Sequence, residues 1–76
     1  MPKTYRPREV IRALESLGWT IVRQRGSHVM LHKEGVRNHV AVPMSRREVN
    51  VGTFRNVLKQ AGMLPEEFDE VAREVL

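Results

Sequence analysis

The chain contains no cysteine among its 76 residues, which excludes disulfide bonds, thiolate metal sites and a cysteine nucleophile. Aromatic residues are scarce, with one Trp, one Tyr and two Phe. No apolar run approaches the roughly 20 residues that span a bilayer, and no secretory signal pattern precedes the first expected helix. These absences predict a small domain that packs without covalent cross-links, has no membrane association and works in the cytoplasm.

What the chain does contain is an uneven excess of positive charge. Its hydrophobic content of 41% is typical of a globular chain, and its length predicts a single domain over residues 1–76. Residues 1–60 carry twelve Lys or Arg against four Glu, a balance of +8, whereas residues 61–76 have a balance of −4. Ten of the thirteen cations are arginine, whose planar guanidinium suits phosphate. The basic body therefore indicates a nucleic-acid partner or an acidic protein partner.

Hydrophobic spacing and the positions of Gly and Pro predict six elements in the order α-β-β-β-α-α. Pro7 suits the start of a helix and Gly18 its end, and Asn50 suits the N-cap of a second helix. The expected helices cover residues 7–17, 51–61 and 65–75, and the expected strands cover residues 19–25, 28–33 and 37–42. The predicted fold class is α+β, a three-stranded antiparallel sheet with helices on one face.

The turn of the second hairpin contains Gly35 and is centred either on Glu34-Gly35 or on Gly35-Val36. Both registers preserve parity, so both predict the same two faces. The core face carries Val and Leu at positions 29, 31, 40 and 42, and the opposite face carries the three histidines and Arg37. In the first strand, Trp19 and Ile21 compete with Val22 for the core, and Trp19 is expected there.

The run from Arg25 through Gly26, Ser27 and His28 places a histidine at the start of a strand, after a glycine and a hydroxyl. RNA carries its own nucleophile, the 2′-hydroxyl, so a protein that cleaves it needs to move a proton and stabilise charge. Histidine as a residue type titrates near neutral pH, which suits the proton step. Gly26 allows close approach of the backbone to a phosphate, and Ser27 offers a hydrogen bond. The competing interpretation of His28 is an ordinary surface histidine.

The remaining candidates are cations expected to hold RNA phosphates together with Gly26 and Ser27: Arg23, Arg25, Lys33, Arg37, Arg46 and Arg47. Arg25 is nearest to His28 in sequence and is the favoured group for stabilising transition-state charge. Arg46 and Arg47 precede the second helix, whose free N–H groups also attract anions. His32 lies about 13 Å from His28 along a strand, and carboxylates are missing nearby, so no metal or other cofactor is expected.

Several blocks in this order resemble the HicA family of toxins: Leu17-Gly18-Trp19, residues 23–28, Val40-Ala41-Val42-Pro43 and residues 52–62. Members of that family are messenger-RNA interferases with a fold like that of double-stranded-RNA-binding domains. The resemblance implies that His28 is the catalytic residue, that mRNA is the substrate and that activity needs no metal. It also implies a HicB-type antitoxin that covers His28 and the basic face.

The chain departs from the family pattern after its third strand. Many members carry a second histidine shortly after the Val-Pro pair, whereas Val42-Pro43 is followed here by Met44-Ser45-Arg46-Arg47. The role of that histidine is either vacant or taken by an arginine. Two other functions fit the same residues: a non-catalytic RNA-binding module of this fold, and an adaptor whose basic face docks an acidic protein.

Overall fold

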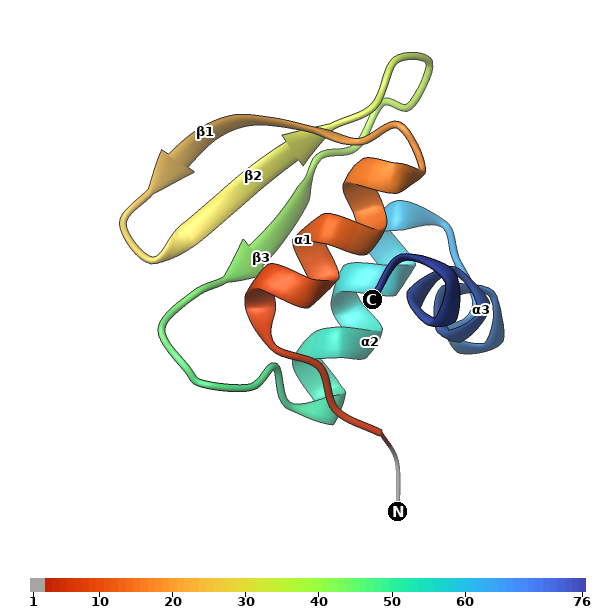
Figure 1. Ribbon diagram of the computed structural model, residues 1–76. Helices are drawn as coiled ribbons and strands as arrows, with labels where there is room; N and C mark the ends of the chain where they lie inside the picture. Colours follow the sequence, from red (N-terminus) through yellow and green to blue (C-terminus); the bar gives the residue numbers. More distant parts are fainter. Residues whose placement is uncertain (1–2) are drawn as a thin grey trace.

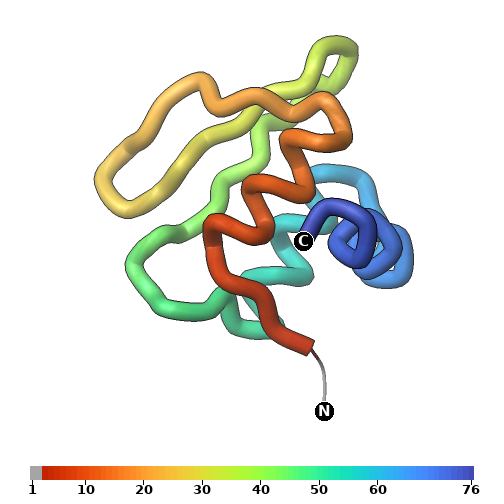
Figure 2. The backbone as a smooth tube through the Cα atoms, viewed as in Figure 1, coloured from red at the N-terminus to blue at the C-terminus, as the bar shows by residue number. Residues whose placement is uncertain are grey.

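A computed structural model describes residues 3–76. Its elements follow the predicted order, with the sheet forming one layer and the helices the other (Figures 1 and 2). The elements are α1 (Pro7–Ser16), β1 (Thr20–Arg25), β2 (His28–His32), β3 (Val40–Pro43), α2 (Val51–Ala61) and α3 (Pro65–Val75). The predicted α+β class, with three antiparallel strands in the order β1-β2-β3, is therefore confirmed.

Helix α1 begins at Pro7, as predicted, because its fixed φ suits the first turn. The Glu9 carboxylate accepts the Arg6 N–H at 2.8 Å, which satisfies a donor at the helix start. Gly18 has a φ of 98°, the left-handed conformation that ends the helix. The buried face of α1, including Val10 and Leu14, packs towards β3 and α3.

The face assignment of the second hairpin is confirmed. Val29 pairs with Val42 and Leu31 with Val40, and all four are buried. This register centres the turn between Gly35 and Val36, the second of the two expected alternatives.

The predicted strand over residues 37–42 was wrong at its start, because β3 begins at Val40. The Val36 N–H donates to the Lys33 carbonyl at 3.0 Å, and Gly35 has a φ of 83°. The chain therefore turns before the ladder forms, and residues 37–39 lie in the connecting loop.

Strand β1 differs most from expectation. All six of its residues are exposed, and Ile21 and Val22 each keep 50% of their surface accessible. The register shifts between Ile21 and Arg23, so Val22 is the extra residue of a β-bulge. Trp19, just before the strand, is buried, which confirms its predicted place in the core. β1 is exposed because it is an edge strand whose extensive contacts are with β2 and not with a helix (Figure 1).

The other edge of the sheet is covered. The Gln60 carboxamide of α2 accepts the Ala41 N–H of β3 at 3.0 Å. α2 starts as predicted, with the Asn50 side chain accepting the Thr53 N–H at 2.8 Å, and it ends at Gly62 with a φ of 72°. The helix is thus fixed at both ends beside β3.

Helix α3 completes the core through Phe68, which is fully buried and makes edge-on contacts with Tyr5 and Phe54, each with ring centroids 5.0 Å apart. The Tyr5 hydroxyl donates to the Asp69 carboxylate at 2.6 Å. Burial, reinforced by that carboxylate, raises the pKa of Tyr5 to about 12. These contacts join α3 to the segment that leads into α1.

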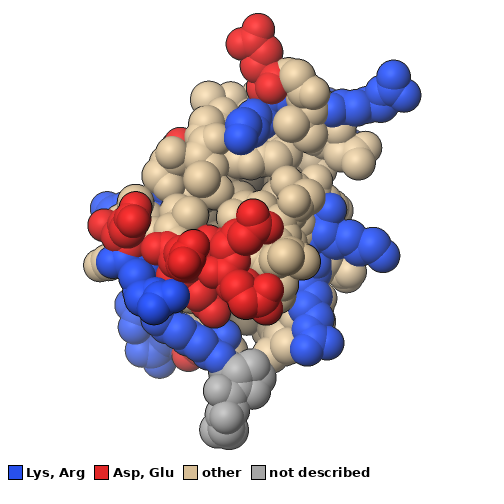
Figure 3. Space-filling view, turned by 90° about the vertical axis from the view of Figure 1, so that its right-hand side faces the viewer, with Lys and Arg blue, Asp and Glu red and all other residues tan. Residues whose placement is uncertain are grey.

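The acidic and basic side chains are partly separated on the surface. Figure 3 shows carboxylates gathered on one face, with Lys and Arg around its margin. Glu66 and Glu67 lie in the first turn of α3, where they favour the helix dipole. Among residues 3–76, no helix is both long and apolar enough to cross a membrane.

Candidate active site

His28 is the first residue of β2 and follows a two-residue connection from β1. Gly26 has a φ of 56°, whereas Ser27 has a negative φ, the combination found in type II′ hairpin turns. The Gln24 side chain donates to the Gly26 carbonyl at 3.2 Å. The turn therefore holds His28 at the tip of a hairpin.

The side chain of His28 is exposed, on the face opposite the core residue Val29. Arg25 is its partner across β1, and Pro43 is its partner across β3. Directly opposed residues in antiparallel strands have Cβ atoms about 4.5–5.5 Å apart on the same face. Arg25 thus lies next to His28 on the same face of the hairpin, as its position in the sequence had suggested.

A second basic segment, residues 44–50, approaches the same turn. The Met44 N–H donates to the Ser27 carbonyl at 2.6 Å. At the other end of the segment, the Val49 N–H donates to the Tyr5 carbonyl at 2.9 Å. Arg46 and Arg47 are exposed between these two attachments. The backbone therefore attaches the first residue of the segment that carries both arginines to the hairpin turn.

A cavity of about 80 Å³ lies where this segment meets α2, lined by Ser45, Arg46, Asn50 and Thr53 among others. The Asn50 side chain already takes the Thr53 N–H, so one of the free donors at this helix start is occupied. An anion here would rely on the arginine and on the remaining donors.

The other expected cations are distributed along the sheet. Arg23 pairs with Met30, on the same face as His28 and further from the tip. Lys33 and Arg37 belong to the loop at the far end of β2, about 13 Å or more from His28 by strand geometry. The structure therefore groups Arg25, Gly26 and Ser27 with His28 and places Lys33 and Arg37 apart.

His32 shares the face of His28 at that far end, and His39 of the connecting loop lies beside it. Their ring centroids are 5.1 Å apart, and the rings are tilted by 36°. In the part of the chain that the structure describes, no three His, Cys, Asp or Glu side chains are grouped to hold a metal ion.

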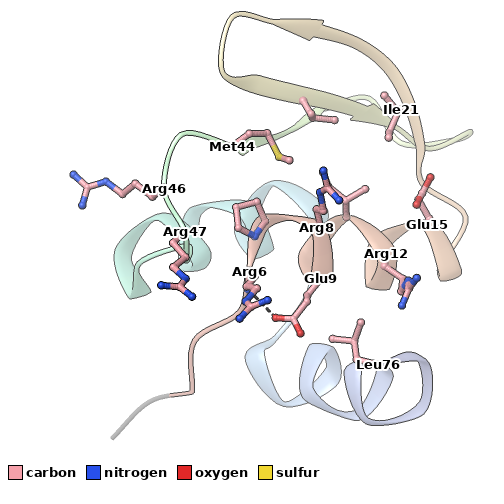
Figure 4. A pocket seen from close by; sticks show the side chains of 13 residues that line it. Arg6, Arg8, Glu9, Arg12, Glu15, Ile21, Met44, Arg46, Arg47 and Leu76 are labelled. Carbon is pink, nitrogen blue, oxygen red and sulfur yellow. Dashed lines mark hydrogen bonds between the residues drawn. The ribbon is translucent and has the colours of Figure 1, made fainter.

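The sequence interpretation missed Arg8 and Arg12 of α1. With Arg46 and Arg47 they line a cavity of about 750 Å³ beneath the β1–β2 hairpin (Figure 4). The available signal was their spacing of four residues, which places two cations on one exposed helix face.

Residues 7–63 match the sequence model of a toxin from bacterial toxin–antitoxin systems. The matched stretch covers about three quarters of the chain, from the start of α1 to just beyond α2, and includes His28. The chain therefore belongs to the HicA toxin family, and the expected resemblance is confirmed. Its family role is that of a toxin with an antitoxin partner. No curated protein matches the sequence.

Proposed function

We propose that this chain is an endoribonuclease that cleaves mRNA without a metal ion, with His28 as its general acid or base. The observation that carries the proposal is the exposed His28 at the hairpin tip, paired with Arg25. The hydrogen bond from Met44 to Ser27 brings the arginine segment to the same place. A proton-transfer group beside several cations is the arrangement that phosphodiester cleavage by the 2′-hydroxyl requires.

In this reaction the 2′-oxygen attacks the adjacent phosphorus, and the bond from phosphorus to the 5′-oxygen breaks. The products are a 2′,3′-cyclic phosphate and a free 5′-hydroxyl. His28 takes the proton from the 2′-hydroxyl or gives one to the departing 5′-oxygen, and water takes or supplies the other proton. Arg25 stabilises the charge that develops on the phosphoryl oxygens, and Arg46 and Arg47 hold neighbouring phosphates.

The turn contributes an accessible backbone. A Cβ built on Gly26 meets no atom within 4 Å, so this face of the turn is open to a ligand. Ser27 adds a hydroxyl next to His28. The segment in which many family members carry a second histidine contains Arg46 and Arg47 here, so electrostatic stabilisation takes the place of a second titrating group.

The same face suits the partner and the compartment that this function implies. A HicB-type antitoxin would inhibit cleavage by covering His28 and the surrounding arginines. The substrate, mRNA, places the activity in the cytoplasm.

The decisive experiment compares His28→Ala with His39→Ala, a loop histidine next to His32 at the far end of the sheet. Purified proteins are incubated with RNA in excess chelator, and cleavage, product ends and RNA affinity are measured. We expect His28→Ala to slow cleavage by roughly 10²–10⁴-fold, the usual effect of a positioned acid or base. His39→Ala should cleave like the parent, with cyclic-phosphate ends.

The outcomes separate the candidate functions. If His28→Ala loses affinity and cleavage together, His28 is a contact residue and the RNA-binding alternative is favoured. Cleavage at the parent rate by folded His28→Ala would remove the catalytic assignment. If chelator abolishes cleavage by the parent protein, metal independence is wrong.

A further inference from the structure

A cavity in the described part of the molecule lies on the side of the sheet away from His28. It occupies about 750 Å³ between α1 and the overhanging β1–β2 hairpin (Figure 4). It exists because α1 packs towards β3 and α3, which leaves the inner face of β1 without a helix. We call this cavity the hairpin groove.

The floor of the hairpin groove is aliphatic. Ile11 and Val29 are buried at its base, and Met44 lies beside them. Ile21 and Leu76 line it with 50% and 46% of their surfaces exposed. Ile21 pairs with the buried Leu31 and therefore faces inward, where a helix would cover it if the layer extended that far. The floor thus offers apolar surface that a partner can remove from water.

The walls of the groove are basic. Five arginines line it against two glutamates, a balance of +3: Arg6, Arg8, Arg12, Arg46 and Arg47 against Glu9 and Glu15. The Glu9 carboxylate accepts a hydrogen bond from the Arg6 backbone, so part of its capacity is already used. Figure 4 shows Arg8 pointing up towards the hairpin, Arg12 one turn further along α1, and Arg46 extending away from the groove. Carboxylates on an occupant would pair with these guanidinium groups.

We propose that the hairpin groove docks an acidic amphipathic helix of a protein partner. One apolar face of that helix packs on Ile21 and Met44, and its flanking carboxylates meet Arg8 and Arg12. The cavity exceeds the ~300 Å³ at the lower end of ligand pockets and is open along one side. Helix-in-groove binding uses this combination of an aliphatic floor and charged walls.

Protein fits the groove better than RNA does. None of the residues that line it is Phe, Tyr or Trp. Proteins that bind single-stranded RNA stack its bases on aromatic side chains in most cases, and an aliphatic floor provides no such platform. The basic walls of the groove would suit either an acidic protein or RNA. The aliphatic floor favours the protein.

The groove and His28 lie on opposite faces of the sheet. Ile21 and Val29 point inward, whereas His28 points outward. Arg46 and Arg47 line the groove and follow Met44, whose N–H donates to the Ser27 carbonyl next to His28. A helix in the groove would therefore leave the imidazole uncovered while drawing on two of the proposed phosphate ligands. This inference does not depend on nuclease activity.

The test uses a synthetic helical peptide of about 18 residues, long enough to form a helix, with Leu on one face and Glu on its flanks. A control peptide has the same composition in scrambled order. Binding is followed by backbone amide NMR shifts and by calorimetry. We expect saturable shifts confined to the groove, including Arg12 and Met44, with the patterned peptide alone.

Variants sharpen the test, and circular dichroism checks their folding. Arg12→Glu and Ile21→Asp change exposed groove residues and should each weaken the peptide at least about tenfold, equivalent to about 1.4 kcal/mol. Arg55→Glu, an exposed arginine of α2 outside the groove, should bind as the parent does. Three results would overturn the proposal: no saturable binding, equal weakening by Arg55→Glu, or displacement of the peptide by an RNA oligonucleotide that shifts the same amides.

Discussion

The hydrogen bond between Tyr5 and Asp69 gives a stability prediction that the structure makes quantitative. Tyr5→Phe retains the ring, which is 97% buried against Phe68 and Phe54, and removes only the hydroxyl. A hydrogen bond to a charged group is worth about 1.5–3 kcal/mol, and a partly exposed acceptor recovers some of this from water. We therefore expect Tyr5→Phe to lower the free energy of unfolding by about 1–2 kcal/mol. The total free energy of unfolding of a chain of this length is about 4–11 kcal/mol.

The same bond predicts a pH dependence with a definite sign. The pKa of Tyr5 rises from its ordinary value of 10.0 to about 12 on folding, so the folded state binds this proton more tightly. The contribution of the protonated Tyr5 hydroxyl to the stability of the fold is complete below pH 10 and is lost as the pH rises through 12. Tyr5→Phe has no such proton. The stability difference between parent and variant should therefore shrink between these pH values.

The assay is urea and thermal unfolding, followed by circular dichroism at pH 8 and at steps up to pH 12. At pH 8 the melting temperature of Tyr5→Phe should fall by about 4–16 °C, from the usual 4–8 °C per kcal/mol in a domain of this size. Glu70→Gln, an exposed neighbour on α3, is the matched control and should change little. Equal stability of parent and Tyr5→Phe, or a difference that stays constant up to pH 12, would refute the reasoning.

Three further predictions concern the hairpin tip, the basic face and α3. Gly26→Ala should lower the free energy of unfolding by about 1–2 kcal/mol, because Gly26 has a left-handed backbone. It should also slow cleavage more than Gly35→Ala does, since Gly35 is a matched glycine in the far loop with open space around it. Equal cleavage by the two variants would contradict the proposed active surface. The affinity of His28→Ala for RNA should fall steeply between about 50 and 200 mM salt, because Lys and Arg contacts release counterions, and a constant affinity in filter binding would point to an apolar contact instead. Truncation after Leu64 removes Phe68, and the loss of a buried Phe side chain alone lowers stability by about 3–5 kcal/mol. The melting temperature should therefore fall sharply, while the protein that remains folded still cleaves RNA. A folded truncated protein without cleavage would show that the active surface is elsewhere.

The sequence predicted the helices and the two faces of the second hairpin because these depend on local rules. Asn50 caps the start of α2 and Gly62 ends it, and both roles depend on capping and backbone conformation that neighbouring residues determine. Val29 and His28 face opposite ways in either register, since parity alone sets the face. The position of His28 beside Arg25 follows from a two-residue turn in the same way.

The sequence could not predict where the helical layer ends. Ile21 and Val22 have the β-branched character of buried strand residues, yet they are exposed because no helix covers β1. That outcome depends on long-range packing of α1 towards β3 and α3. The same packing creates the hairpin groove, so Arg8 and Arg12 were recognised as charges without a site.

The two edges of the sheet give the molecule an asymmetric capacity for assembly. The Gln60 side chain occupies the Ala41 N–H at the β3 edge, beside which α2 packs, so added strands meet the sheet more readily along β1. There the bulge and the charges of Arg23 and Arg25 oppose a second copy, because antiparallel self-pairing would bring like charges together. Salt screens that repulsion. Salt that weakens RNA binding should therefore also favour edge-to-edge aggregation, and storage at low ionic strength should keep the protein dispersed.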